Sequence, residues 1–522
     1  MIRLARPHVF GSLVALALTV AACTPASPAP SSTGGSAPAP GSAQQDFKLS
    51  VALASNITTL DPHAAIGTNP RRYGLYECLI AQDETGKLIP ALATSWSNIN
   101  PTTWELKLTP NRKFHDGNPV TAEDVKYSFD RATNPDLKLG ILARTGTIDQ
   151  TTIVDPGTVR ITTKGPDPIF LKRVAMVVIV EKAHVERVGT AGFGTQGMGT
   201  GPYMMKEFNG TDRLVMVPNP YYPEKPGASE VTVRAVPEAS ARLAGLRTGE
   251  IDVAAGVAID MAESVTREGV QVVNFNQGQN IGAFLFSNLQ GEPTQSKLVR
   301  QAINYAIDKE AIAKNIFKGL TKPTGQIVQS NTVGYNPNIK PYPFDPAKAK
   351  QLLAQAGYPN GFKMRMDVTL GTTGAEAIFL VIQSQLRDIG IDASIEQSAD
   401  SAFLLDRWYG RTARGHTLTA GLLNSPAMDA DFALTWFKGT EAEPARRHND
   451  PEFDKYYIPS TIEMDEKKRS ELLQKAIEVM YENPPYIYLI DGVTLWGASS
   501  KLTNVLPRGD LEPRLDIIRK KS

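Results

Sequence analysis

The chain has 522 residues, of which 42% are hydrophobic and 21% are charged, a composition typical of a folded water-soluble protein. Its 55 Lys and Arg residues balance 54 Asp and Glu residues, so the net charge of +1 gives no basic surplus for binding nucleic acid and no acidic tail. The part after the N-terminal region, about 480 residues, exceeds a single hydrophobic core, and we therefore expect more than one lobe.

The N-terminal segment has the parts of a secretory signal peptide. Two arginines precede the mostly apolar residues 9–22, which are too few and too interrupted to span a bilayer. The segment ends in Val20-Ala21-Ala22-Cys23, which resembles the lipobox of bacterial lipoproteins. That resemblance implies a lipoprotein signal peptide over residues 1–22 and an acylated thiol on Cys23. An ordinary signal peptide with a chance cysteine is the alternative.

The next stretch predicts a disordered tether. Residues 24–43 carry no charge and no large apolar side chain, so they cannot bury a core. At about 3 Å per residue they could extend roughly 60 Å. We therefore expect residues 23–45 to hold a soluble part near a membrane through lipid. Once Cys23 is acylated, only Cys78 remains, so no internal disulfide is expected.

Strand and helix patterns alternate along the rest of the chain. Alternating apolar and polar residues predict strands over residues 47–53 and 104–108, and turn residues precede two further predicted strands, over residues 157–163 and 214–217. Capping residues predict helices that begin after Thr121, with Asp124 completing a capping box, and after Asp345, where Pro346 follows. Amphipathic spacing predicts further helices over residues 296–318, 376–390 and 466–483. This mixture predicts an α/β protein with several sheets.

The sequence carries no familiar catalytic motif, neither G-x-S-x-G nor H-E-x-x-H nor Walker A. One dinucleotide fingerprint occurs at residues 192–197, but further glycines and Pro202 follow, so no helix can start in register to hold a pyrophosphate. Asp429 and Asp431 could form a carboxylate or metal pair, although solvated or capping roles are commoner for such pairs. We predict no catalytic residue, no cofactor and no metal.

A series of short motifs follows along the mature chain: Thr59–His63, Tyr76-Glu77, Glu84–Trp96, Lys113–Val125, Gly199–Tyr203, Asn219–Tyr222, Gly249–Asp252, Val299–Asp308 and Leu352–Tyr358. In this order they resemble the bacterial solute-binding proteins of family 5, also called cluster C, which serve peptide, nickel and opine ABC transporters. The motif residues themselves have a structural interpretation, as turns and core positions, so the ligand site is expected elsewhere.

The resemblance implies a two-lobe, hinge-bending fold of the type II periplasmic binding proteins, with an extra subdomain in the first lobe. The first lobe would span residues 46–283, with the inserted subdomain at about 82–198, and would be completed by residues 486–522. The second lobe would span residues 284–485. The crossing strands are expected near residues 284–288 and 486–490, which are short and apolar.

The resemblance also indicates a cleft segment. Peptide-binding relatives often use an aspartate to pair with the peptide amino terminus, and matching Asp429 to the family's later acid places Pro426 at that position, which weakens a peptide interpretation. Upstream, Arg414 and His416 could bind an anionic group, whereas the aromatic residues could equally belong to the core. The candidate ligand-binding residues are Trp408, Tyr409, Arg414, His416, Asn424, Ser425, Asp429, Trp436, Phe286 and Asn288.

The resemblance therefore implies an extracytoplasmic receptor of an ABC importer. It would capture a small organic solute, either a peptide or an amino-acid-derived carboxylate, and deliver it to permease subunits that work with a cytoplasmic ATPase. The protein would be a monomer, anchored by lipid on the periplasmic face in a Gram-negative cell or on the outer face of the plasma membrane in a Gram-positive cell. The alternatives are an exported hydrolase and a signalling receptor without import.

Overall fold

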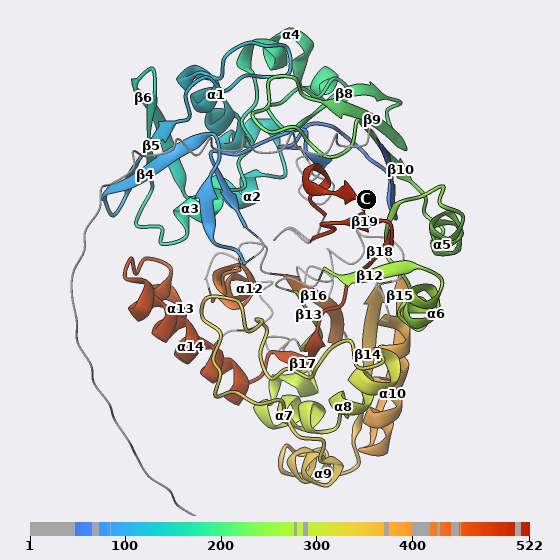
Figure 1. Ribbon diagram of the computed structural model, residues 1–522. Coiled ribbons are helices and arrows are strands. Elements are labelled where there is room, and N and C mark those ends of the chain that lie inside the picture. Colours follow the sequence, from blue (N-terminus) through green and yellow to red (C-terminus); the bar gives the residue numbers. More distant parts are fainter. Residues whose placement is uncertain are drawn as a thin grey trace, which may run out of the picture. The chain divides into compact units, whose positions relative to one another are not determined.

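The computed structural model describes residues 47–64, 73–83, 85–275, 279–285, 291–369, 375–398, 418–424, 428–439, 448, 450–506 and 513–521 (Figure 1). The predicted signal peptide, Cys23 and the tether lie outside these ranges and stay predictions. The chain divides into two units, Met1–Gln44 and Gln45–Ser522, and every described residue belongs to the second. Within the described ranges, no helix is both long enough and apolar enough to cross a membrane.

A seven-stranded sheet forms the first layer of the fold. Its strand order is β12 (Val270–Asn274), β18 (Leu495–Ser499), β11 (Val253–Ala255), β1 (Lys48–Leu53), β10 (Glu230–Ala235), β9 (Arg213–Pro218) and β8 (Tyr203–Phe208). β1 pairs in parallel with β10 and β11, and the other pairs are antiparallel. Two helices, α5 (Ala239–Thr248) and α6 (Ala262–Arg267), pack beside β11 and β12. The predicted strands over residues 47–53 and 214–217 are confirmed as β1 and β9.

A four-stranded antiparallel sheet follows in the chain. Its order is β4 (Ala93–Asn100), β5 (Thr103–Leu108), β7 (Thr158–Thr163) and β6 (Ile148–Asp155), next to a hairpin of β2 (Ile80–Gln82) and β3 (Leu88–Pro90). Its core is built with α1 (Ala122–Thr133) and α3 (Phe170–Val174), with α2 (Leu142–Thr145) between these helices and α4 (Lys182–Phe193) after them in the chain. The capping box predicted at Thr121 is present, because each partner's side chain accepts from the other's backbone N–H.

A buried polar network ties α1 to the first sequence motif. Arg131 on α1 donates to both carboxylate oxygens of Asp61, at 3.0 and 2.5 Å, and to Nδ1 of His63 at 2.9 Å. The other ring nitrogen of His63 donates to the carbonyl oxygen of Val178 at 2.9 Å. Burial, and then the charge of Arg131, lower the pKa of His63 to about 4. The ring is therefore neutral at pH 7, and this motif is part of the scaffold.

A five-stranded sheet forms the second large layer. Its order is β15 (Ile391–Ser398), β14 (Phe362–Thr369), β16 (Leu418–Asn424), β13 (Gln279–Leu285) and β17 (Tyr486–Asp491). β14 runs parallel to β15 and β16, and β13 runs antiparallel to β16 and β17. Gly282 is required where β13 meets β17, since a Cβ there would lie 2.1 Å from the ring of Tyr486.

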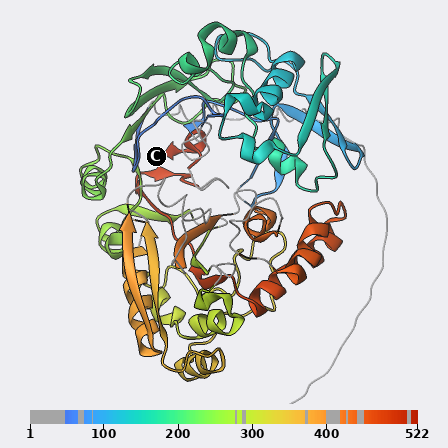
Figure 2. The same cartoon turned by 180° about the vertical axis from the view of Figure 1, so that it is seen from behind.

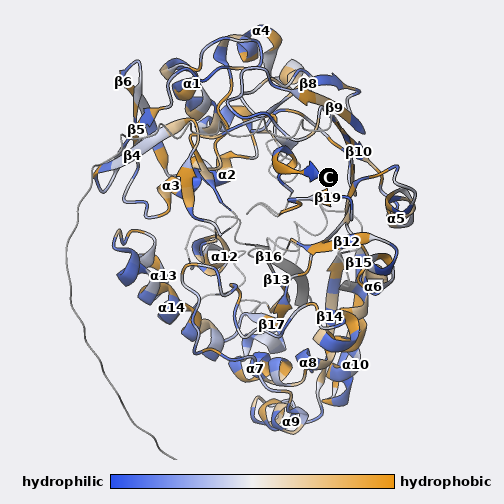
Figure 3. Ribbon diagram, in the orientation of Figure 1, coloured by the Kyte–Doolittle hydropathy of each residue, from blue (hydrophilic) through white to orange (hydrophobic). Residues whose placement is uncertain are grey.

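Helices cover both faces of this sheet. α10 (Ala375–Asp388) lies along β14 and β15 in both views, and it packs into a core shared with α7 (Lys297–Tyr305) and α9 (Pro346–Gln355) (Figures 1 and 2). The opposite face packs against α12 (Asp431–Leu434), α13 (Pro451–Ser460) and α14 (Glu466–Glu482). The buried residues of α10 and α14 recur every three or four positions, so each helix has one buried face, and both helices also carry polar residues (Figure 3).

The helix predicted over residues 296–318 is wrong in its length. α7 ends at Tyr305, and a short α8 (Lys309–Ala311) and a π-helical turn (Ile312–Ile316) follow. The break arises because Lys309 is buried and its Nζ donates to the carbonyl oxygens of Asn304 and Ile307, at 2.6 and 3.1 Å. Asp308 then caps a new turn by accepting from the N–H of Ala311. The helical spacing of apolar residues continues through this break, and for that reason the sequence predicted one continuous helix.

The chain changes sheet at two places among the described residues. It leaves the seven-stranded sheet after β12 and enters the five-stranded sheet at β13, and it returns between β17 and β18. Of the segments predicted as crossing strands, Phe284 and Leu285 end β13, residues 286–288 lie outside the described residues, and residues 486–490 belong to β17, so the changes of sheet lie beside these strands. We call the seven- and four-stranded sheets with their helices the first lobe, and the five-stranded sheet with its helices the second lobe. The residue boundaries predicted for the lobes stay predictions.

Candidate functional site

The strands of the five-stranded sheet end together at one edge. β14, β15, β16 and β17 point the same way and end at Thr369, Ser398, Asn424 and Asp491, and the antiparallel β13 begins there at Gln279. In α/β proteins, ligands bind outside the carboxyl ends of the strands. Both connections to the first lobe also leave from this edge. We call it the carboxyl edge, and it is the candidate ligand site.

The predicted ligand residues divide into two groups. Asn424 is the last residue of β16 and pairs with Gln279, so its backbone lies at the carboxyl edge. Trp436 lies in the turn after α12, half-buried against the core of the second lobe. The remaining predicted residues, apart from Asp429, lie outside the described residues, and their roles stay predictions: Trp408, Tyr409, Arg414, His416, Ser425, Phe286 and Asn288.

Asp429 is fully buried and its carboxylate is strongly paired. Arg469 on α14 donates to both oxygens in a bidentate pair, at 2.7 and 2.8 Å, and the N–H of Asp431 donates to Oδ1. Burial alone would raise the pKa of Asp429, but the hydrogen bonds and charge of Arg469 outweigh it and hold the pKa below its usual value. These contacts fix the segment before α12 onto α14. A direct contact between Asp429 and a ligand stays a prediction.

The alternative of a metal site at Asp429 and Asp431 is not supported by the surroundings. In the part of the chain that the structure describes, no three His, Cys, Asp or Glu side chains come together as a metal site would require. Asp431 accepts from the hydroxyl of Tyr457 at 2.9 Å. Burial, and then the charge of Asp429, raise the pKa of Asp431, so the two carboxylates are organised by cations and hydrogen bonds within the protein.

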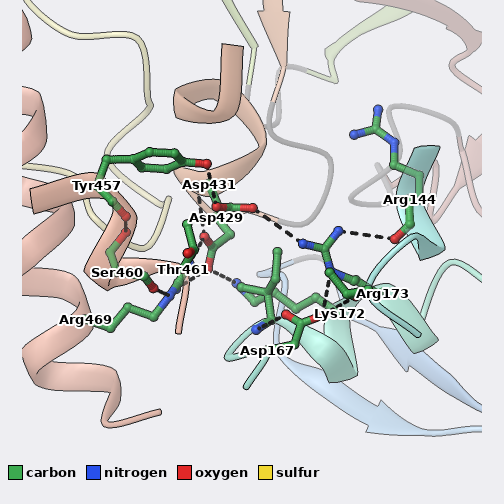
Figure 4. Close-up of polar contacts among 12 residues, drawn as sticks. Arg144, Asp167, Lys172, Arg173, Asp429, Asp431, Tyr457, Ser460, Thr461 and Arg469 are labelled. Atoms are coloured by element: carbon green, nitrogen blue, oxygen red, sulfur yellow. Dashed lines mark hydrogen bonds and ion pairs between the residues drawn. The ribbon is translucent and has the colours of Figure 1, made fainter. Parts of the chain in front are cut away.

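Cations from the first lobe reach these two carboxylates (Figure 4). Lys172 on α3 donates to the carbonyl oxygen of Met428 at 3.2 Å and to Asp429 Oδ2 at 3.3 Å. Its neighbour Arg173 lies 3.6 Å from Asp431 and is oriented by Asp167. We call Asp167, Lys172, Arg173, Asp429, Asp431 and Arg469 the interlobe ion cluster. The cluster holds α3 of one lobe against α12 of the other.

Apolar contacts extend the same junction. Phe432 on α12 is 5% exposed and packs with Ile169 and Met176 of the first lobe. The guanidinium groups of Arg144 and Arg173 lie over its ring, 5.1 and 5.7 Å from the centroid. At Gly86, which has a φ of +84°, a Cβ would lie 2.3 Å from the sulfur of Met428. Because these contacts join the two lobes, separation of the lobes would break them.

A separate pocket of about 400 Å³ lies in the first lobe, between the β2–β3 hairpin and the C-terminal segment. Four of its charged groups form ion pairs, Glu77 with Arg112 and Arg514 with Asp516 at 2.6 Å, and Glu224 also lines it. Burial raises the pKa of Glu77, and Arg112 opposes that rise. Because both arginines of the lining are already paired with carboxylates, this pocket is a weaker candidate for an acidic solute than the carboxyl edge.

The fold and the carboxyl edge define a two-lobe binding protein of the kind that serves ABC transporters. Residues 87–444 match the sequence profile of the bacterial extracellular solute-binding proteins, family 5 Middle, and the chain belongs to this family. These are extracytoplasmic binding proteins without a catalytic function, which sets aside the alternative of an exported hydrolase.

Relatives support this assignment over nearly the whole chain. The chain is 29% identical over 467 residues to the glutathione-binding protein GsiB of Pectobacterium atrosepticum, which covers 87% of this chain and 90% of that protein. Among solved structures, the periplasmic binding protein DppA of Helicobacter pylori in complex with the peptide STSA superposes with a TM-score of 0.79 at 26% identity, covering 91% of this chain and 98% of that one. NikZ of Campylobacter jejuni, with a TM-score of 0.77 at 22% identity over 90% and 97% of the chains, shares the fold. The predicted α/β fold of periplasmic binding proteins is confirmed.

Two polar residues at the carboxyl edge were missed by the sequence analysis. Asn280 lies at the start of β13, and Asp491 ends β17, one residue beyond the predicted crossing strand. The one signal available in the sequence was for Asp491, which is the polar residue directly after the apolar run from Tyr486 to Ile490. The basic pair on α3 had no comparable signal, because its partners in the second lobe lie more than 250 residues away, as the 257-residue separation of Lys172 and Asp429 shows.

Proposed function

We propose that the solute is amino-acid-derived, a peptide or a related compound with a carboxylate group, and that the protein passes it from between the lobes to permease subunits powered by a cytoplasmic ATPase. The observation that carries this proposal is the convergence of four parallel strand ends at the carboxyl edge, beside both connections between the lobes. A solute bound there would touch both lobes and would favour the closed arrangement through contacts that the open one lacks.

The class of solute rests on relatives and on sequence. Of the relatives named above, GsiB is named for binding glutathione and DppA is in complex with the peptide STSA, and both of these ligands are built from amino acids and carry carboxylates. In this chain, Arg414 and His416 lie in the connection between β15 and β16. An arginine fork matches a carboxylate in a bidentate pair, and a partly protonated histidine adds a second donor. Asn424 and Ser425 would supply further hydrogen bonds at the end of β16.

Native mass spectrometry of freshly purified protein tests the proposal, because a co-purified small molecule reveals the solute class. Calorimetry with that molecule then compares Arg414→Ala with wild type. Loss of a desolvated contact between arginine and carboxylate should weaken binding about a hundredfold or more. Arg387→Ala, which alters an exposed arginine on α10, is the matched control. Wild-type affinity in Arg414→Ala, or a co-purified solute without an acidic group, would contradict the proposal.

The position of the protein in the cell envelope forms the second part of the proposal. The lipobox-like segment ending at Cys23, followed by an uncharged tether, supports a lipid-anchored monomer at the outer side of the cytoplasmic membrane or the periplasmic face. A signalling receptor without import is the remaining alternative. Permease and ATPase genes beside this gene would favour import, whereas a membrane sensor gene alone would favour signalling.

A further inference from the structure

A pair of polar side chains lies at the carboxyl edge where both connections between the lobes begin. Asn280 on β13 stands directly opposite Asp491 on β17, so the two side chains share one face of the sheet. The amide Nδ2 of Asn280 donates to Asp491 Oδ1 at 3.1 Å. Phe284 shares this face two pairs further along β13 and contacts Phe437, so the pair lies on the side that α12 covers.

Both residues keep an acceptor to which no described residue donates. Asn280 is fully buried, and its Oδ1 has no hydrogen-bond partner among the described residues. Asp491 is half-buried and forms no ion pair with any residue that the structure describes. A buried carbonyl oxygen without a donor is costly, and each such group in a native protein calls for an explanation. A donor from outside the chain would satisfy both atoms.

The surroundings of Asp491 favour an added positive charge. Among the described residues, Lys322 is the positively charged residue near Asp491. Its backbone carbonyl oxygen accepts from the N–H of Asp491. Burial outweighs Lys322 and the hydrogen bond from Asn280, and it raises the pKa of Asp491 to about 6. Ile281, Ile490 and Val493 beside the pair are buried apolar residues, which strengthen electrostatic contacts there. Among the described residues, the ionised carboxylate therefore lacks a sufficient counter-ion.

We propose that Asn280 and Asp491 form a subsite for an ammonium group of the solute. An ammonium carries donors and no acceptor, and so complements an acceptor pair. Opposite residues of an antiparallel pair have Cα atoms about 4.5–5.5 Å apart, so one ammonium can reach both side chains. This subsite rests on the proposed function. Its carboxylate would be the counter-ion for the solute's ammonium group, since Pro426 stands where peptide-binding relatives often have an aspartate for that purpose. Together with Arg414 it would select a solute that carries both an amine and a carboxylate.

Calorimetry with two pairs of probes tests the subsite: glutathione and Ala-Ala-Ala, each with a free amine and in an N-acetylated form. Wild type should bind at least one free-amine probe about a hundredfold more tightly than its acetylated form, because acetylation removes the charge that Asp491 would pair. Asp491→Asn keeps the side-chain shape and should reduce that preference to less than about fivefold. Asp392→Asn, which changes an exposed residue at the opposite end of β15, is the matched control and should keep the full preference.

Folding and the proposed function are controlled separately. Asp491→Asn should melt at the same temperature as wild type or higher, since it removes an unpaired half-buried charge. If Asp491→Asn still prefers the free amine, the subsite is overturned. The subsite is also overturned if wild type binds free and acetylated probes equally, or if wild type binds neither free-amine probe. A co-purified solute that lacks an amine would also overturn the subsite while leaving a carboxylate-binding receptor intact. A purified protein with no captured acidic solute would instead count against the proposed function.

Discussion

Lys172 Nζ lies 3.3 Å from Oδ2 of Asp429, a residue 257 positions later in the chain, and this ion pair joins the two lobes. The side chain of Asp429 is 1% exposed and that of Lys172 is 17% exposed. Asp429 already holds a bidentate pair with Arg469 inside its own lobe, so its charge is balanced even when the lobes separate. The pair with Lys172 thus adjusts the balance between open and closed arrangements without being needed for folding.

Lys172→Met should shift this balance toward the open arrangement. The variant keeps the apolar stem of the side chain but loses the ion pair, which contributes about 1 kcal/mol at a half-buried position. Solute affinity should fall roughly fivefold, since fewer molecules are closed before binding. Small-angle scattering of the solute-free protein should show a larger radius of gyration. Lys182→Met, which removes an exposed pair with Glu186, is the control, and equal radii for all three proteins would refute the prediction.

Arg469→Ala should destabilise the second lobe strongly. The substitution leaves Asp429 buried without its bidentate partner, and breaking a buried pair from one side costs about 3–5 kcal/mol. Urea unfolding measures this loss as a lower midpoint. Arg267→Ala removes an exposed pair with Glu263 and should change the free energy of unfolding by less than about 0.5 kcal/mol. Similar midpoints for the two variants would show that Asp429 is compensated in another way.

Acid should destabilise the first lobe through His63. Its folded-state pKa of about 4 lies below the ordinary value of 6.5, so the unfolded chain binds a proton that the folded chain rejects between these values. The stability that this histidine provides is complete above pH 6.5 and is lost as the pH falls toward 4. The loss amounts to about 3 kcal/mol.

Urea unfolding of wild type and His63→Gln at pH 7, 5.5 and 4.5 isolates this contribution. Glutamine does not titrate, so the difference in unfolding free energy between the two proteins should shrink as the pH falls. The groups that face the ring are Arg131, Asp61 and the carbonyl of Val178, and both proteins keep them. If the difference in unfolding free energy between the two proteins stays constant from pH 7 to 4.5, protonation of His63 does not destabilise the folded state, and the prediction is wrong.

Cys23→Ser should release the protein from the membrane fraction. The prediction rests on the small residues before Cys23 and on the uncharged tether after it. A serine carries no thiol for acylation, and a single lost anchor leaves a soluble chain. Fractionation of cells labelled with a fatty-acid analogue measures the change, with Cys78→Ser as the control because that thiol is buried in the first lobe. Retention of labelled Cys23→Ser in membranes would disprove the lipid site.

Local signals explain which elements the sequence predicted correctly. Asp345 accepts from the N–H of Lys348 and starts α9, and Thr121 starts α1, because a cap and its partner lie within a few residues of each other. The helix over residues 296–318 failed because one buried side chain, Lys309, satisfies the carbonyl groups that end α7. The spacing of apolar residues cannot predict that a lysine side chain is buried.

The candidate site was less predictable because it depends on contacts between distant segments. The pairing of Asp429 with Arg469 spans 40 residues, and each partner alone looks like a surface charge. Asn280 and Asp491 become opposite only through strand pairing across 211 residues, so their proximity could not be predicted from the sequence. The motifs that revealed the family are part of the scaffold, as the burial of Asp61 and His63 shows, and they carry no information on the solute.

The two connections between the lobes are tied to each other at their described ends. Asn274 pairs with Leu495 at one end and Asn280 with Asp491 at the other, while the N–H of Phe275 donates to the carbonyl oxygen of Thr494 between them at 2.8 Å. Connections bonded to each other in this way resist torsion and sideways sliding but bend easily across their plane. We therefore expect the lobes to open and close by rotation about one hinge axis. Each solute-bound molecule should then present the same surfaces of the two lobes at the same angle to each other.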